Sequence, residues 1–241
     1  MIKDNLSTLL QSIPDSATLV AVSKTKPVAS LLEAYEAGQR DFGENKVQEM
    51  ADKVSALPQN IRWHMIGHLQ RNKVKYIAPF VSLIHSVDSI RLLNEIDKQG
   101  QKNDRVIDCL LQVRIAQEET KFGLTFDSCD EILNQNNYTH VRIRGLMGMA
   151  SFTDNQSQIE SEFKSLAQYY KQHRDQYDWD TLSMGMSGDY PLAISCGSTM
   201  IRVGSLILAY ETKGYVRCCG CRNDWREIRR RGHHRNCGLS I

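Results

Sequence analysis

Two lysines that follow a buried strand are the first residues whose types and spacing suggest chemistry. Residues 18–22 form an unbroken apolar or β-branched run, which is typical of a strand buried on both faces of a parallel sheet. Lys24 and Lys26 come directly afterwards, and Pro27 suits the first turn of a helix. Lys24 therefore lies at the carboxyl end of a predicted central strand, where parallel α/β folds bind ligands.

These lysines allow two interpretations. A lysine at such a position is usually a solvated loop charge. Alternatively, Lys24 is a Schiff-base amine, because partial burial and the nearby Lys26 cation would favour the neutral form whose lone pair attacks an aldehyde. The strand by itself leaves both interpretations open.

A second set of candidate groups follows the last two predicted strands. Ser187-Gly188 and Gly204-Ser205 combine small side chains with backbone N–H groups that an anion can approach closely. In a parallel barrel, the loops after strands seven and eight are the usual phosphate site. An amine after strand one and a phosphate site after strands seven and eight describe a ligand that is both an aldehyde and a phosphate ester.

The elements that would position these groups alternate along the chain. The predicted strands cover residues 18–22, 41–45, 62–67, 83–87, 109–115, 141–149, 181–187 and 200–208. The predicted helices cover residues 4–13, 28–37, 47–57, 72–80, 127–136, 159–170 and 191–195, with one more that Ser89 caps and Gly100 ends. This alternation predicts an α/β fold, a single closed (β/α)8 barrel of the TIM type. An open doubly wound sheet is the alternative, but no glycine-rich nucleotide turn follows the first strand.

Composition excludes several functional classes. The 241 residues are 41% hydrophobic and carry a formal charge of +2. Residues 211–241 contain eight Lys/Arg and three Asp/Glu, which leaves 22 positive and 25 negative charges, or −3, on the remainder. An acidic body argues against a nucleic-acid surface, and no run of about eighteen apolar residues predicts a membrane span. We expect a cytoplasmic protein without a signal peptide, whose scattered Cys109, Cys129 and Cys196 are reduced core residues.

Several motifs in one order resemble the signature segments of a known family. They are Val22-Ser-Lys-Thr-Lys-Pro27, Phe42-Gly-Glu-Asn45, Trp63-His-Met-Ile-Gly67 with Leu69-Gln70 and Asn72-Lys73, Leu182-Ser-Met-Gly-Met-Ser187, and Gly197-Ser-Thr-Met-Ile-Arg-Val-Gly204. The chain is similar over about residues 1–207 to the pyridoxal phosphate homeostasis proteins.

The resemblance implies a barrel like the N-terminal domain of alanine racemase (fold type III of the pyridoxal phosphate proteins), without the second domain of that enzyme. It implies that pyridoxal 5′-phosphate (PLP) is bound, with Lys24 as the Schiff-base lysine. It also implies that Arg202 donates to the pyridine nitrogen. A guanidinium at that position keeps the nitrogen unprotonated and weakens the cofactor as an electron sink.

The resemblance extends to the rest of the pocket. Ser187, Gly204 and Ser205 match phosphate contacts, with Ser205 where the family usually has threonine. Asn45 and His64 match positions that line the pocket.

Three of these residues have a second interpretation. Asn45 could instead cap a helix, and His64 could be a satisfied core histidine. Lys121 matches a further family lysine near the barrel mouth, for which a solvated loop is the alternative.

The expected function is a carrier or buffer of the cofactor in PLP homeostasis, without robust catalysis of its own. Racemases of this fold need a second domain and a partner subunit to supply another acid/base residue, whereas this barrel would use nearly the whole chain as a monomer. The expected partners are PLP and PLP-dependent apoenzymes. The alternative is a small racemase-type enzyme that uses a local base such as His64.

The end of the chain departs from the family pattern. The family continues after strand eight with Phe-Gly-x-Arg, whereas this chain reads Ile207-Leu-Ala-Tyr-Glu-Thr-Lys213. If Leu208 through Thr212 are encoded by TTG GCG TAC GAA AC, one added T gives Phe-Gly-Val-Arg-Asn. We therefore divide the chain into a barrel, residues 1–207, and a disordered basic tail, residues 208–241, translated out of frame. Cys218 and Cys221 meet the spacing of a zinc site only in part, so no metal is expected.

Overall fold

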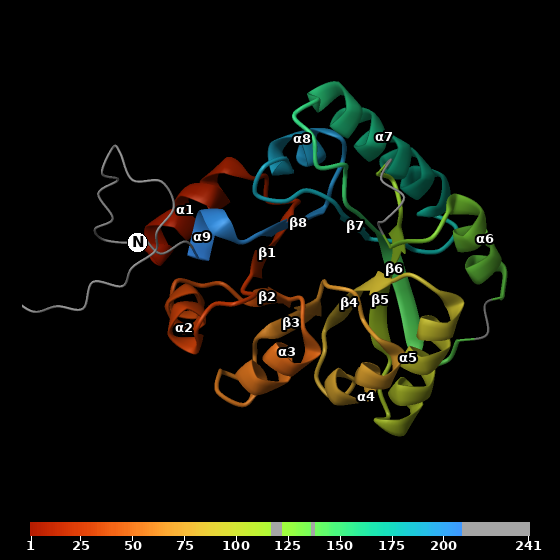
Figure 1. The fold of residues 1–241 in the computed structure, drawn as a ribbon, viewed down its shortest axis with the longest axis horizontal. Helices are drawn as coiled ribbons and strands as arrows, with labels where there is room; N and C mark the ends of the chain where they lie inside the picture. The colour runs from red at the N-terminus through yellow and green to blue at the C-terminus, as the bar shows by residue number, and fades with distance from the viewer. Residues whose placement is uncertain (117–121, 136–137, 209–241) are drawn as a thin grey trace, which may run out of the picture. The chain divides into compact units, whose positions relative to one another are not determined.

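The strands of this computed structural model, which describes residues 1–116, 122–135 and 138–208, close into a barrel (Figure 1). Eight strands pair in the order β1 to β8, β8 returns to β1, and all the pairs are parallel. The strands are β1 Thr18–Val22, β2 Asp41–Glu44, β3 Arg62–Met65, β4 Leu83–Val87, β5 Ile107–Val113, β6 Val141–Gly148, β7 Thr181–Ser183 and β8 Met200–Val203. The predicted (β/α)8 barrel is confirmed, and the open-sheet alternative is wrong.

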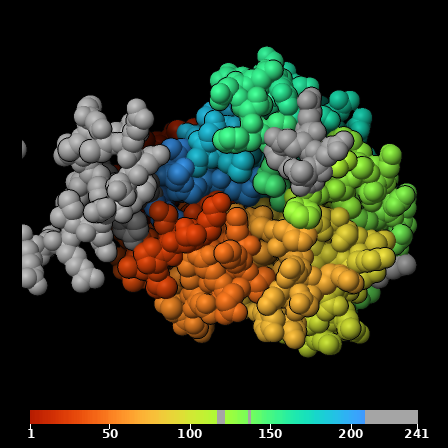
Figure 2. Space-filling view, viewed as in Figure 1, coloured from red at the N-terminus to blue at the C-terminus, as the bar shows by residue number. Residues whose placement is uncertain are grey.

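Helices cover the outside of this barrel (Figure 1). They are α1 Ile2–Ser12, α2 Val28–Glu36, α3 Val47–Val54, the 3₁₀ helix η1 Arg71–Lys73, α4 Val74–Ile77, α5 Ile90–Lys102, α6 Phe126–Gln135, α7 Gln156–His173, α8 Tyr190–Ser195 and α9 Ser205–Leu208. Figure 2 shows the first helices beside the last described residues, where Asn5 donates to the Ile207 carbonyl over 3.4 Å. In the part of the chain that the structure describes, no helix combines the length and the apolar character needed to cross a bilayer.

Several predicted boundaries are wrong, among them the end of the seventh strand, which stops at Ser183 instead of residue 187. Two others differ for local reasons that the contacts show. The expected strand over 200–208 stops at Val203, because the N–H groups of Ile207 and Leu208 bond to the Gly204 carbonyl and form the turn of α9. Helix α5 begins at the predicted Ser89 cap but continues past Gly100 to Lys102. A Cβ on Gly100 would lie 2.7 Å from the His140 carbonyl oxygen, so this glycine permits close packing instead of ending the helix.

The core has an apolar shell and a mixed interior. Between strands and helices, Phe42, Phe163 and Leu31 are fully buried. Inside the barrel, a smaller cluster contains Val20, Leu83, Leu110, Met147 and Met200. The interior also holds buried polar side chains, His64, His85, Ser183 and Arg202. Because burying polar groups is costly unless they are hydrogen-bonded, these residues indicate a functional region inside the barrel.

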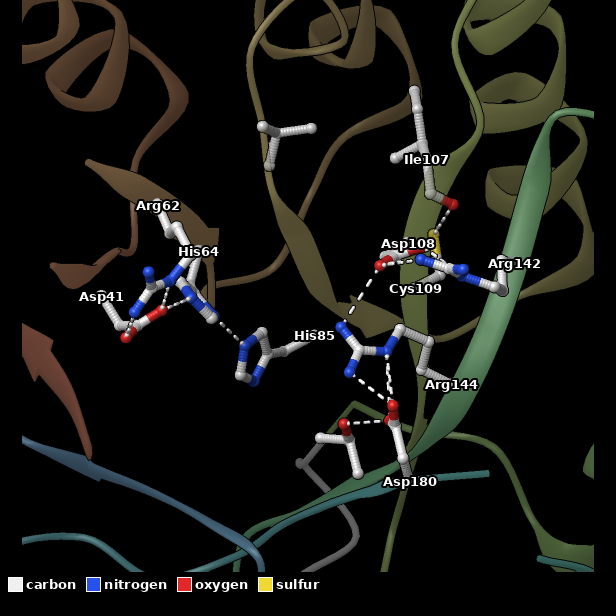
Figure 3. A network of polar contacts seen from close by, with 12 residues as sticks. Asp41, Arg62, His64, His85, Ile107, Asp108, Cys109, Arg142, Arg144 and Asp180 are labelled. Atoms are coloured by element: carbon white, nitrogen blue, oxygen red, sulfur yellow. Dashed lines mark hydrogen bonds and ion pairs between the residues drawn. The ribbon is translucent and has the colours of Figure 1, made fainter. Parts of the chain in front are cut away.

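A β-bulge in β6 shapes the wall of the barrel where β6 pairs with β5 and β7. Cys109 pairs with Ile143 but Leu110 pairs with Gly145, so Arg144 is left over and its guanidinium bonds Asp180 (Figure 3). Gly145 has φ +144°, and a Cβ there would lie 1.9 Å from the Thr181 carbonyl oxygen. Only glycine allows β6 to pass this close to β7.

Candidate functional site

The turn after β1 presents Lys24 at the carboxyl end of the barrel. β1 ends at Val22 and Ser23 is buried, whereas Lys24 is exposed. The Schiff-base interpretation assumed partial burial of Lys24, which is wrong, whereas the solvated-loop interpretation expected this exposure. The difference arises because the chain turns at Thr25, with φ +62°, instead of continuing along the sheet. The amine is therefore open to a ligand entering from this end.

A buried ion-pair network centred on Lys53 of α3 holds this turn in place. Lys53 Nζ donates to the Ser23 carbonyl at 2.8 Å and to Glu44 Oε1 and Glu49 Oε1 at 2.7 Å each. Glu49 Oε1 also accepts from the Thr25 N–H at 2.5 Å. Burial raises the pKa of Glu44, although hydrogen bonds from Lys53 and Ser23 oppose that shift. Helix α3 thus holds the residues on both sides of Lys24.

Arg202, on β8, is buried inside the barrel. Nη1 donates to the Ser183 carbonyl at 2.9 Å and to Ser183 Oγ at 2.6 Å, and Nη2 donates to the Gly148 carbonyl at 3.0 Å. Burial lowers the Arg202 pKa to about 10, so the guanidinium stays cationic at neutral pH. These three bonds use three of its five N–H donors, so two have no acceptor among the described residues and can serve a ligand.

The ends of β7 and β8 bring the predicted phosphate contacts together. The Gly204 N–H donates to Ser187 Oγ at 3.4 Å, and Ser205 begins α9 as an exposed residue. A Cβ on Gly204 would lie 2.9 Å from the Val22 carbonyl oxygen. Gly204 therefore packs directly against the end of the strand that precedes Lys24, so the predicted amine and phosphate groups share one rim.

Asn45 directly follows β2 and is partly exposed on the same rim. The N-cap of α3 is Lys46, without a capping side-chain hydrogen bond. The helix-cap interpretation of Asn45 is therefore wrong. A Cβ on Gly67 would lie 2.4 Å from the Asn45 carbonyl oxygen, so the loop after β3 packs tightly on Asn45.

His64 lies inside the barrel with both ring nitrogens engaged. Nε2 is 3.0 Å from Asp41 Oδ1 and Nδ1 is 2.9 Å from His85 Nε2 (Figure 3). The side chain is 4% exposed. This arrangement fits the core-histidine interpretation, because neither nitrogen is free for a ligand. Burial raises the pKa of Asp41, but hydrogen bonds from His64 and Arg62 outweigh it, and the net pKa is lowered.

Sequence reasoning missed the supporting residues Glu44, Lys53, His85 and Ser183. Two signals were available. Glu49 and Lys53 have the i,i+4 spacing of a helical ion pair, and His85 is an ionisable residue in the middle of the predicted buried strand 83–87. Neither signal reveals the long-range partner that makes the residue important.

Other predicted residues lie outside the described part of the chain. These are Lys121 and all of residues 209–241, with Cys218 and Cys221, for which a zinc site was considered and not expected. Within the described ranges, no group of three or more His, Cys, Asp or Glu side chains is arranged to hold a metal ion.

Comparison with known proteins gives consistent matches. The family described as alanine racemase, N-terminal domain, matches residues 1–212. A pyridoxal phosphate homeostasis protein of Vibrio alginolyticus is 41% identical over 205 residues, which cover 80% of this chain and 86% of the relative. The solved structure of PipY from Synechococcus elongatus, with PLP bound, is 35% identical with a TM-score of 0.80 and covers 86% of this chain and 100% of PipY.

A more distant match concerns the fold alone. An alanine racemase from Clostridium difficile is 12% identical with a TM-score of 0.68. The match covers 86% of this chain and 55% of the racemase.

Proposed function

The chain belongs to the alanine racemase N-terminal domain family and, within it, to the pyridoxal phosphate homeostasis proteins, and from this premise we propose that it binds PLP covalently through Lys24 and serves as a carrier or buffer of that cofactor. The observation that supports this most directly is the rim where Gly204, bonded to Ser187, packs against the end of the strand that precedes Lys24. An amine and an anion site on one rim suit a ligand that is both an aldehyde and a phosphate ester.

The groups present fit PLP by their chemistry. Ser187 and Ser205 provide hydroxyl donors for a phosphate, and the Gly204 N–H, which donates to Ser187 Oγ over 3.4 Å, lies beside them. Arg202 has two unused donors for a ring nitrogen. Asn45 contributes an amide on the same rim, and His64 supports the pocket from the barrel interior.

These roles favour holding the cofactor over catalysis. PLP supplies an electrophilic carbon and a ring that withdraws electrons most strongly when its nitrogen is protonated. Arg202 keeps its own proton, because its pKa of about 10 is far above that of a pyridine nitrogen. His64 is engaged at both ring nitrogens, so it offers no free base for the alternative, a racemase-type enzyme.

The finer features of the proposal concern partners and setting. We propose a monomer in the cytoplasm that passes PLP to PLP-dependent apoenzymes and has no nucleic-acid or membrane partner. The acidic charge of −3 on residues 1–210 supports the absence of a nucleic-acid surface.

We also propose that residues 1–207 are the PLP-binding barrel and that residues 208–241 arise from a shifted reading frame. The gene sequence tests this directly. A one-base insertion near codon 208 should restore an in-frame Phe-Gly-x-Arg, and a gene in which no such insertion does so would contradict the proposal.

The carrier and racemase functions differ in one measurement. The PLP-loaded protein is incubated with L-alanine in deuterated water, and deuterium at the α-carbon is followed by NMR. We expect exchange no faster than with free PLP at the same concentration. Exchange at enzyme-like rates that is lost in Lys24→Ala would contradict the carrier function.

A further inference from the structure

A continuous hydrogen-bonded chain crosses the barrel interior between Arg202 and Asp41. Arg202 Nη1 is 2.6 Å from Ser183 Oγ, which is 3.1 Å from His85 Nδ1. His85 Nε2 is 2.9 Å from His64 Nδ1, and His64 Nε2 is 3.0 Å from Asp41 Oδ1 (Figure 3). The residues come from β8, β7, β4, β3 and β2, so the chain joins strands on opposite sides of the barrel.

The two ends of this chain determine its proton positions. A guanidinium can only donate and a carboxylate can only accept. Ser183 Oγ therefore accepts from Arg202, and its own proton points to His85 Nδ1. His85 must then carry its proton on Nε2 and donate to His64 Nδ1. His64 in turn carries its proton on Nε2 and donates to Asp41.

The opposite proton arrangement breaks the chain while both imidazoles are neutral. If His85 carried its proton on Nδ1, its Nε2 lone pair would face the Nδ1 lone pair of His64. Ser183 Oγ would also face two donors and would lose the acceptor for its own proton. Buried polar groups without partners cost stability, so the first arrangement is strongly preferred.

The surroundings of His85 support a neutral imidazole, and the far end of the chain is an anion. His85 is fully buried. Its pKa is held well below 6.5 by burial first, and a proton on His85 would also be opposed by any charge on His64 and by the Arg202 cation. At the other end, Arg62 donates to both carboxylate oxygens of Asp41, at 2.6 Å and 2.5 Å, and holds that group as an anion.

We propose that His85 and His64 are positioning residues. The Asp41 carboxylate fixes their proton positions, so that His85 Nδ1 accepts the Ser183 proton. Ser183 Oγ then accepts from Arg202 and holds it with its two unused donors toward a ligand ring nitrogen. The identity of that ligand rests on the function proposed above, whereas the proton order of the chain does not. Ser183 accepts from Arg202 in a fixed orientation only while its proton has the His85 acceptor. Without that acceptor, the hydroxyl turns toward another carbonyl and Arg202 loses one of its bonds.

The first test reads the proton positions in the protein without added PLP. Long-range ¹H–¹⁵N NMR distinguishes protonated from unprotonated ring nitrogens, and His85→Gln and His64→Gln spectra assign the signals. At pH 7 we expect both histidines to be neutral and protonated on Nε2. The exposed His68, which pairs with Asp88, serves as a reference outside the chain. A His85 ring protonated on Nδ1, or a charged imidazole at either position, would overturn the proposal.

The second test measures whether His85 acts through Arg202. PLP dissociation constants are determined for wild type, His85→Leu, Arg202→Met and the double variant, with His68→Gln as the matched control. His85→Leu should weaken binding about tenfold, the factor expected when a buried donor loses its acceptor. In the Arg202→Met background it should have almost no further effect, because neighbours in one network are not additive.

The outcomes separate this proposal from the proposed function. An equal loss in both backgrounds, or no loss in either, would refute a positioning role. If His85→Leu fails to fold, Ser183→Ala replaces it in the same cycle. A wild-type protein that does not bind PLP would refute the proposed function, and the NMR result would still decide the proton order.

Discussion

Replacing Lys53 by methionine tests how much the buried ion-pair network next to Lys24 stabilises the fold. Methionine keeps most of the aliphatic length and removes the ammonium group, which contacts Glu44, Glu49 and the Ser23 carbonyl. Glu44 is fully buried, and its Oε2 has no partner among the described residues. The variant therefore leaves a buried carboxylate without its counter-charge.

The magnitude follows from that unpaired charge. Removing one partner of a buried ion pair costs about 3–5 kcal/mol, a large part of the roughly 5–15 kcal/mol that stabilises a typical domain. Urea unfolding at pH 7, followed by circular dichroism, should show this loss in the free energy of unfolding. The double variant Lys53→Met/Glu44→Gln is the matched control, because it removes both charges and should recover most of the stability.

The pH dependence gives an independent check. Burial already raises the Glu44 pKa above 4.5, and loss of the ammonium raises it further. A carboxyl whose pKa is raised in the folded state takes up its proton there first, so acid favours the folded form. The cost of Lys53→Met should shrink as the pH is lowered from 7 toward 5. A loss below about 1 kcal/mol at pH 7, or an equal loss in the double variant, would refute the reasoning.

Three further predictions follow from single residues. Gly145→Ala should destabilise the protein by more than about 2 kcal/mol in urea unfolding, because its Cβ would collide with the Thr181 carbonyl, and a smaller loss would contradict the bulge geometry. His85 has a pKa well below 6.5 in the folded state, so the unfolded chain binds that proton at a higher pH. Stability should therefore be retained above pH 6.5 and fall below it. In thermal unfolding, His85→Gln should reduce this dependence of stability on pH. Burial raises the Cys109 pKa well above 9.0, so peptide mapping after iodoacetamide treatment of the native protein should find Cys196 modified and Cys109 intact, whereas rapid Cys109 modification would contradict its burial.

The sequence predicts the barrel well because its signals are local and repeated. β1 and β4 have the predicted limits, since each is a short apolar run bounded by polar residues. The predicted end of β8 is wrong because apolar residues such as Ile207 and Leu208 suit a strand as well as the single turn of α9. Apolar pattern alone does not distinguish those two conformations over four residues.

The candidate site is predicted only where motifs carry it. Lys24 follows from its place at the end of a predicted strand together with the family resemblance, whereas Arg202 follows from the resemblance alone. Lys53 and His85 do not, because their importance comes from partners such as Glu44 and Ser183, brought together by the closing of the barrel. Local sequence contains no measure of such long-range contacts.

The most direct test of the account concerns the covalent attachment at Lys24. The purified protein is loaded with PLP, reduced with borohydride and digested, and the peptides are measured by mass spectrometry, with Lys26→Ala as the matched control for the neighbouring amine. We predict that the reduced cofactor mass is found on the peptide containing Lys24, is unchanged in Lys26→Ala and is lost in Lys24→Ala. Stoichiometric attachment at another lysine in the Lys24→Ala protein, together with its absence from Lys24 in wild type, would contradict the account.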